Sequence, residues 1–453
     1  MPWRSLLQLG IVVAVGTATA AFNPSLATGL AVFVLLVAVS EWDLQHAWLL
    51  IVVMAPWGTL MNALTEGRLA PLGFDLLLIV FAIALLAQPS HALRADKQVG
   101  LVMAATLGVL LIGVGGIFNS KGLSTIDGME GFRAFFLPLL ALPIGLFLAR
   151  RINGFGGDLC AAVVVSALMV ACMGIRQVAT PSGVDLAIIT NSQTNIEPFL
   201  VSGTNRLRAF SPLPGPFHFG LLMLIGITVL AAEVIPRPGR WKFAALLALL
   251  VALLLNATRL NWLGTAVALG SLFLSSLDLA SIRMWLLRTA AAILLVASSL
   301  WASFRLDALQ PIRQFAISVI DPATTTSFIY RVLGWRHDIL PAIMNSLWIG
   351  YGTGMAKDGL GPFTSHNLFL KLLIEGGTAL LAVYLVLIAT AFVALWRRRQ
   401  DHHAQLGIAL LVGVHAAGMF GPILDAYPGN LLVWLIVGAG LARPLRAAPQ
   451  VTS

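Results

Sequence analysis

Continuous apolar runs separated by polar segments fill the chain from end to end. Many of them approach the ~20 residues that an α-helix needs to cross a bilayer, and they lack the apolar–polar alternation of an outer-membrane barrel. The pattern predicts an all-α polytopic membrane protein with about 12–14 transmembrane helices, built as a single membrane domain over residues 1–453. The predicted spans are residues 5–22, 26–41, 45–62, 72–89, 98–117, 133–149, 157–176, 217–235, 242–256, 260–278, 285–303, 367–396, 405–420 and 427–442.

The composition agrees with this class. Of the 453 residues, 58% are hydrophobic and 10% are charged, whereas about a quarter of the residues in a soluble domain are charged. Cys160 and Cys172 share one apolar run, and we interpret them as packing residues. The N-terminal segment, with Arg4, an apolar stretch and Ala-Thr-Ala at 18–20, is similar to a signal peptide. Because the next apolar run follows almost at once, we interpret this segment as an uncleaved first helix.

The positive charges predict which side of the membrane each loop faces. The net charge of +9 does not indicate a nucleic-acid partner, because most basic residues lie in short loops between apolar runs. With the spans above, all of these loops fall on the same side as Arg4. We therefore expect them, and both termini, to be cytoplasmic. The residues concerned are Arg94, Lys97, Arg150, Arg151, Arg237, Arg240, Lys242, Arg283, Arg288, Arg397, Arg398, Arg399, Arg443 and Arg446.

Two long hydrophilic loops, residues 177–216 and 304–366, are predicted to face outward, and both carry arginines. An arginine in an outward loop is contrary to the rule that Lys and Arg concentrate in cytoplasmic loops. A single one is explained by an interfacial salt bridge or by snorkelling, but these loops hold few acidic partners. Taken together, the outward arginines favour an external anion, since the guanidinium fork binds phosphate through two charge-assisted hydrogen bonds. They are Arg206 and Arg208 before one helix, Arg259 in a tight turn, and Arg331 and Arg336.

A diphosphate at a membrane surface is the anion of a polyprenyl-linked sugar. Arg206, Arg208 and Arg259 flank helices at the depth where such a diphosphate would lie, and they could stabilise it as bound substrate and as leaving group. The outward loops contain no Asp-x-Asp and no other acidic cluster suited to Mg²⁺ or Mn²⁺. We therefore expect neither a metal nor another cofactor.

Three histidines are candidates for the base that such a transfer requires. His366 lies at the outer end of a predicted span, where the positive end of the helix favours the neutral, basic imidazole. His218 and His337 are rivals, and each histidine could equally be an ordinary interfacial residue. Inside the span, Asn367, Lys371 and Glu375 fall at i, i+4 and i+8, so they form one polar stripe in which Lys371 can pair with Glu375. We interpret this stripe as structural support beneath His366.

At these residues the sequence resembles the O-antigen ligase and O-antigen polymerase superfamily. "SHNLFLKLLIEGG" resembles its signature of His-Asn, nine residues and Gly, here His366, Asn367 and Gly377. "YRVLGWRHDILPAIMNSLWIGYGTG" and "NRLRAFSPLPGPFHFGLLM" resemble two further arginine-containing segments of the family. "LLNATRLNWLG" resembles its turn motif, with Arg259 and Gly264. The resemblance covers roughly residues 200–440.

The resemblance implies an inverting, metal-independent glycosyltransferase in a bacterial inner membrane, with its site facing the periplasm. Such enzymes move a glycan from undecaprenyl diphosphate to an acceptor sugar hydroxyl. The acceptor is lipid A-core for a ligase and a second lipid-linked repeat for a polymerase. The matched spacing from His366 to Gly377 favours a ligase, which takes part in lipopolysaccharide maturation. Against a ligase, Leu380 stands where ligases tend to have Gly, Thr or Tyr, so a polysaccharide polymerase is the alternative.

Two readings from other classes stay open. A transporter or flippase of a lipid-linked anion should carry its polar groups near the bilayer midplane and show an internal repeat. This chain instead concentrates them in outward loops and shows no repeat. A non-catalytic assembly subunit would be indifferent to the loss of His366.

Overall fold

The computed structural model describes residues 48–49, 51–53, 55–58, 78–79, 97–119, 122–192, 199–200, 207–235, 239–276, 326–357 and 361–442. Within these ranges the elements are helices, and the only β-type pairing is an isolated bridge between Leu200 and Leu207. The predicted all-α class is therefore confirmed. The predicted spans 5–22, 26–41 and 285–303 lie outside the described residues, as do half of 45–62 and most of 72–89.

The described helices follow the predicted spans closely. Four of them are long and apolar enough to cross a membrane, and a bent pair at 43° adds a fifth if it counts as one span. The four are α6 (Lys97–Phe118), α9 (Phe155–Ala179), α11 (Pro216–Val234) and α18 (Leu368–Trp396). The bent pair joins α7 (Thr125–Phe135) to η3 (Leu137–Leu140) and α8 (Ala141–Arg151). The total of 12–14 spans stays a prediction.

Further helices occupy the remaining predicted spans and part of the long loops. Four predicted spans correspond to α12 (Arg240–Asn256), α13 (Arg259–Ser276), α19 (His402–Gly418) and α20 (Gly429–Gly440). The 3-10 turn η1 (Ala55–Trp57) lies in the predicted span 45–62, and the 3-10 turn η8 (Ile423–Asp425) lies between the last two predicted spans. The long loop segments contain α10 (Gly183–Ser192), α16 (Thr326–Gly334), the π-helical turn η7 (Trp335–Ile339) and α17 (Leu340–Asn345). The long hydrophilic loops thus contain short helices of their own.

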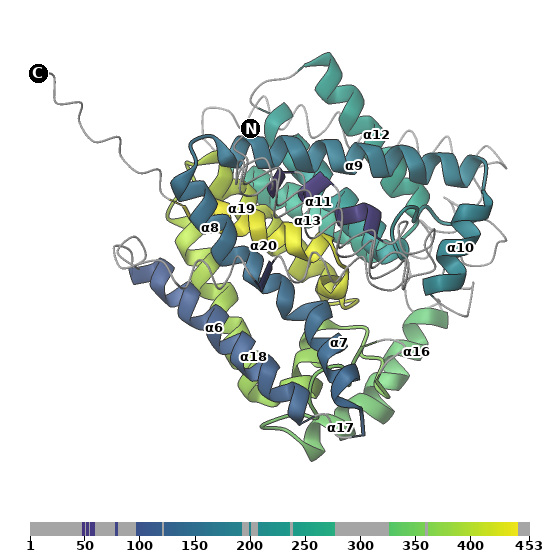
Figure 1. Cartoon of the computed structure of the whole chain (residues 1–453), viewed down its shortest axis with the longest axis vertical. Coiled ribbons are helices and arrows are strands. Elements are labelled where there is room, and N and C mark those ends of the chain that lie inside the picture. The colour runs from purple at the N-terminus through teal and green to yellow at the C-terminus, as the bar shows by residue number, and fades with distance from the viewer. Residues whose placement is uncertain are drawn as a thin grey trace, which may run out of the picture.

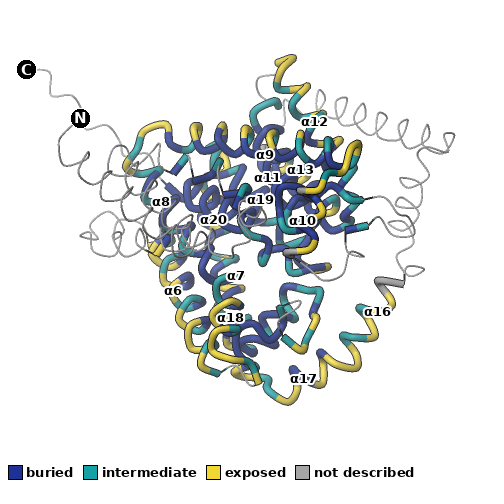
Figure 2. The backbone as a smooth tube through the Cα atoms, turned by 45° about the vertical axis from the view of Figure 1, so that its right-hand side comes forward, coloured by how far each residue is buried: buried dark blue, intermediate teal, exposed yellow. Residues whose placement is uncertain are grey.

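The helices α11, α19 and α20 form the centre of the bundle, where most residues are buried (Figure 2). Figure 1 shows α6 and the C-terminal part of α18 side by side at one edge. There α6 exposes a stripe of apolar side chains that includes Leu101, Leu107, Leu111 and Phe118. Such a stripe at helical spacing is suited to contact with lipid.

The crossing of α13 and α19 depends on small residues. A Cβ added at Gly264 would lie 3.0 Å from the backbone oxygen of Gly413, and one added at Gly413 would lie 2.6 Å from Cβ of Ala268. Two helices can approach this closely only where side chains are small. Gly264, the last residue of the turn motif, therefore allows α13 to pack closely against α19. This packing also fixes the Arg259 turn at the start of α13.

Candidate functional site

The start of α18 is built by the His366–Asn367 pair. Asn367 is the N-cap: its Oδ1 accepts from the backbone N–H groups of Phe369 at 2.8 Å and Leu370 at 3.0 Å. These bonds satisfy donors that have no partner at the first turn of a helix. His366, one residue earlier, has φ +45° and is half-buried. A left-handed backbone at a residue other than glycine is uncommon and is found disproportionately at functional sites.

The predicted span 367–396 is not one straight helix, which corrects the sequence-based expectation. Gly377 has φ +63° and ψ −163°, a conformation that divides α18 into two parts. The Phe135 ring lies 5.8 Å from Lys371 Nζ and 5.8 Å from the Tyr384 ring centroid. The first part, with Asn367, Lys371 and Glu375, and the second part, with Tyr384, meet at this kink, and both contact Phe135.

A glycine-containing segment, residues 346–354, pairs with the break. Backbone N–H groups of Tyr351 and Gly352 donate to the oxygens of Ile374 at 2.7 Å and Glu375 at 2.9 Å. In return, the N–H of Thr378 donates to Leu347 O at 2.7 Å. Backbone groups freed by the break are costly unless they find partners, and this segment supplies them. The Gly350-Tyr351-Gly352 stretch and Gly377 thus form one structural unit.

The loop that follows α19, residues 419–425, joins three of the predicted motifs. Asn367 Nδ2 donates to Met419 O at 2.8 Å, and Arg331 Nη1 donates to Phe420 O at 2.9 Å. A Cβ added at Gly421 would lie 2.8 Å from Leu260, the residue after Arg259. This loop, called the 419–425 loop below, therefore brings the starts of α13 and α18 and the side chain of Arg331 into one region.

The segment that carries Arg208 is attached to the end of α12. Arg208 Nε donates to Leu200 O at 2.7 Å, and the next residue, Ala209, donates its N–H to Leu255 O at 3.1 Å. Asn256, the last residue of α12, is buried, and its Nδ2 donates to Ala209 O and to Pro216 O, both at 2.8 Å. Because Arg259 follows Asn256 by three residues, these bonds hold both arginines near the α12–α13 turn.

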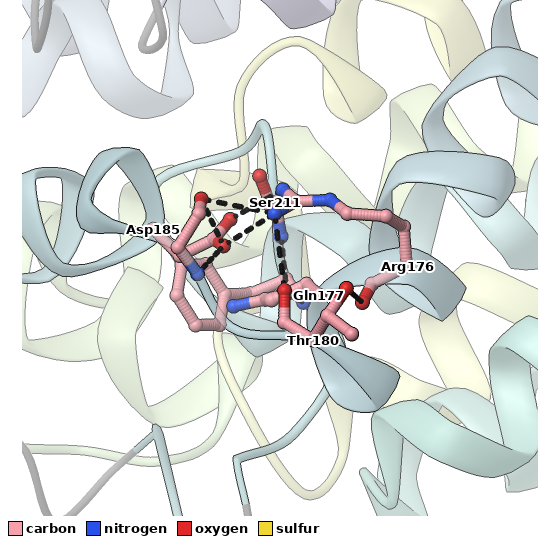
Figure 3. Close-up of polar contacts among 7 residues, drawn as sticks. Arg176, Gln177, Thr180, Asp185 and Ser211 are labelled. Atoms are coloured by element: carbon pink, nitrogen blue, oxygen red, sulfur yellow. Dashed lines mark hydrogen bonds and ion pairs between the residues drawn. The ribbon is translucent and has the colours of Figure 1, made fainter.

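A polar cluster at the end of α9 holds the other side of this segment (Figure 3). Gln177 Oε1 accepts from the N–H groups of Phe210 and Ser211, both at 3.0 Å. Arg176 binds the buried carboxylate of Asp185 through two hydrogen bonds of 2.9 Å. Burial alone would raise the pKa of Asp185, but hydrogen bonds from Ser182 and Arg176 lower it below its usual value.

Arg259 lies close enough to Arg208 to shift the pKa of that residue. Burial, and then the positive charge of Arg259, lowers the pKa of Arg208. Two guanidinium groups held together by the backbone repel each other, and a bound anion relieves that repulsion. Arg259 also begins α13, and the start of a helix favours negative charge. The pair is chemically suited to a phosphate group.

The remaining candidates are two exposed residues, one buried histidine and one residue outside the described ranges. Arg206 is outside them. Arg336 and His337 are exposed on η7, whereas their neighbour Trp335 donates from Nε1 to the oxygen of Ser365, the residue before His366. His218 lies in the first turn of α11, and its buried Nδ1 has no hydrogen-bond partner among the residues that the structure describes. The structure therefore associates Arg331 with the 419–425 loop more directly than Arg336, His337 or His218.

The predicted pair of Lys371 and Glu375 is present, with Nζ and Oε1 2.8 Å apart. Lys371 has a second carboxylate partner that sequence reasoning missed, Asp425 of the 419–425 loop, at 3.1 Å. A signal for it exists in the sequence, because Asp425 is the single acidic residue between the apolar runs 405–420 and 427–442. Because Asp425 lies far from Lys371 in the sequence, the contact between them could not be predicted.

Comparison with known families identifies a match to part of the chain. The family model described as O-antigen ligase matches residues 244–385, which include Arg259, Arg331 and the signature from His366 to Gly377. A search of curated protein sequences found no significant match. The resemblance to the O-antigen ligase and polymerase superfamily is confirmed by this domain match.

Proposed function

We propose that this chain, a multi-pass membrane protein with an O-antigen ligase domain at residues 244–385, transfers a glycan from undecaprenyl diphosphate to an acceptor sugar hydroxyl. The reaction takes place at the periplasmic face of a bacterial inner membrane. The observation that carries the proposal is the 419–425 loop, which contacts Asn367, Arg331 and the residue beside Arg259. Residues from three distant motifs thereby surround one region at the ends of α13, α18 and α19.

In the proposed reaction, the acceptor oxygen attacks the anomeric carbon of the donor sugar. The bond from that carbon to the diphosphate breaks, and the diphosphate keeps the electron pair. His366 takes the proton from the acceptor hydroxyl, as a neutral imidazole is suited to do near neutral pH. A single displacement of this kind inverts the anomeric centre.

Arg208 and Arg259 would stabilise the charge that develops on the leaving diphosphate. Fixed cations are most effective where negative charge grows in the transition state, and arginine can offer both oxygens of a phosphate a hydrogen bond. Arg206 and Arg331 are second contributors to the same anion site. Because arginine supplies this stabilisation, we expect transfer to need no metal and no other cofactor.

The metal independence can be measured directly. Transfer by purified protein should proceed at an unchanged rate after treatment with EDTA and in buffer without Mg²⁺ or Mn²⁺. A matched reaction with EDTA and excess Mg²⁺ controls for effects of the chelator on the membrane. A strict requirement for a divalent cation would overturn the arginine-based scheme.

The acceptor decides between a ligase and a polymerase. We favour a ligase with lipid A-core as acceptor, supported by the description of the matching family. The test is incubation of reconstituted protein with lipid-linked repeat units, with and without lipid A-core. Glycan on the core supports the ligase, and lengthened lipid-linked chains indicate the polymerase. Donor that crosses the bilayer uncleaved would contradict transfer and indicate a transporter.

A further inference from the structure

Lys371 is the cation of a buried cluster of three charges. Its side chain is 0% exposed, and Nζ lies 2.8 Å from Glu375 Oε1 and 3.1 Å from Asp425 Oδ2. The face of the Phe135 ring lies 5.8 Å from the same nitrogen. Burying charges has a large desolvation cost, and apolar residues often replace such clusters without loss of stability. Stability alone is therefore a poor explanation of this cluster, whereas fixing the register of packed elements is a well-attested one.

The two carboxylates belong to different parts of the candidate site. Glu375 Oε1 also accepts from the backbone N–H groups of Gly354 at 3.1 Å and Ala356 at 3.4 Å, so it holds the glycine-containing segment. Asp425 ends η8 in the 419–425 loop. Lys371 connects that loop and that segment to the first part of α18 through one ammonium group.

The cluster lies one helical turn from the start of α18. The N–H of Lys371 donates to the oxygen of Asn367 at 2.9 Å, and Asn367 Nδ2 donates to the 419–425 loop through Met419 O at 2.8 Å. Without the ammonium, the carboxylates of Glu375 and Asp425 would repel each other inside the protein. The loop and the helix start would then separate at Asn367, the residue next to His366.

We propose that Lys371 is a positioning residue, which sets the register between the start of α18 and the 419–425 loop and so places His366 relative to Arg259. It acts through Glu375 and Asp425 and does not touch the substrate. The catalytic consequence rests on the proposed function, whereas the register itself is a property of the fold. The two parts can be tested separately.

A cross-link tests the register without any measurement of activity. A Cβ at Gly418 would lie 3.2 Å from Cβ of Leu368, near the separation of about 3.8 Å usual in disulfides. The double variant Leu368→Cys/Gly418→Cys, in a Cys172→Ser background, should cross-link readily on mild oxidation. Adding Lys371→Met should slow that cross-link about tenfold or more, because a disulfide tolerates little change in geometry.

The matched control for the cross-link is Lys357→Met. Lys357 also pairs with a carboxylate, Glu130 at 2.6 Å, but the pair is partly exposed and does not involve the 419–425 loop. It should leave the cross-linking rate unchanged. Normal cross-linking in the Lys371→Met background would overturn the proposal.

Transfer kinetics test the catalytic consequence. Lys371→Met should lower kcat about 100-fold, as small displacements of reacting groups do, while the donor KM stays within about threefold. The triple variant Lys371→Met/Glu375→Gln/Asp425→Asn contains no unpaired buried charge, so it controls for misfolding, and it should still lower kcat because the ion pairs that set the register are absent. A wild-type kcat in a folded triple variant would show that the cluster contributes packing only and does not position His366. If the wild-type protein transfers no glycan, the proposed function fails, and the cross-link still decides the register.

Discussion

The histidine and the asparagine of the His366–Asn367 pair have separate roles at the residue scale. Asn367 caps α18 through Phe369 and Leu370 and reaches Met419 with its other amide atom. His366 has a left-handed backbone immediately before that cap. Asn367 thus accounts for the geometry at the start of α18, and His366 is the residue proposed to act in the reaction.

Replacing Arg259 by lysine tests whether the proposed anion contact needs a planar fork. Lysine keeps the positive charge but cannot make two parallel hydrogen bonds to a phosphate. We expect the transfer rate to fall about 100-fold, the loss typical of one transition-state donor. Arg336→Lys, at an exposed position on η7, is the matched control and should transfer normally. Wild-type rates for Arg259→Lys would argue against bidentate contact.

The Asp185 cluster predicts a dependence of stability on pH. Hydrogen bonds hold the pKa of Asp185 below its usual value, so the carboxylate contributes stability above the unfolded pKa of about 3.9. That contribution is lost as the pH falls through the lowered, folded pKa. Asp185→Asn should therefore melt at a lower temperature than wild type at pH 7, and the difference should narrow toward pH 3.

Thermal unfolding in detergent at both pH values checks this expectation. Asp338→Asn is the control, because Asp338 is exposed on η7 and should leave both melting temperatures unchanged. A difference between Asp185→Asn and wild type that does not depend on pH would contradict the assigned cause.

At the element scale, the break in α18 is the feature that sequence analysis could not predict. A glycine within a long apolar run is compatible with a continuous transmembrane helix, and "LLIEGGTALL" contains no proline that would indicate a break at Gly377. The break depends on partners from residues 346–354, which supply hydrogen bonds to Ile374, Glu375 and Thr378. Such pairing is a tertiary effect and leaves no periodic pattern.

Gly377→Ala tests the break. The combination of φ +63° and ψ −163° is available essentially only to glycine, and an added Cβ would lie 2.3 Å from the backbone of Trp348. We expect a loss of stability of about 3 kcal/mol or more, with loss of transfer. Gly115→Ala, in the interior of α6 with open space around its Cβ position, should be neutral or stabilising. Normal melting and activity of Gly377→Ala would contradict the described backbone.

At the scale of the whole molecule, the class of fold and most described helices followed from apolar runs alone, because a bilayer sets the length of its helices. The positions of Arg208, Arg259 and His366 at the borders of apolar runs were also predicted, because such polar residues are visible in the sequence. The contacts of Asp425 and the turn at Gly377 were not, because both arise where distant segments meet.

The predicted sidedness can be tested by cysteine labelling. Tyr330 on α16 and Trp241 on α12 are both well exposed, and positive charges assign them to opposite sides. In a Cys172→Ser background, Tyr330→Cys should react with an impermeant maleimide in intact spheroplasts. Trp241→Cys should react only after permeabilisation. Labelling of both from the same side would contradict the topology.

The central claim is that His366 acts with the arginines in one glycan-transfer site. Its most direct test is a single-turnover measurement with reconstituted protein, lipid-linked glycan and acceptor, comparing wild type with His366→Ala and with the exposed-site control His337→Ala. The account predicts transfer by wild type and His337→Ala, and a rate at least about 100-fold lower for His366→Ala, as expected for a lost general base. Equal rates for His366→Ala and wild type, or no transfer by any of the three, would contradict it.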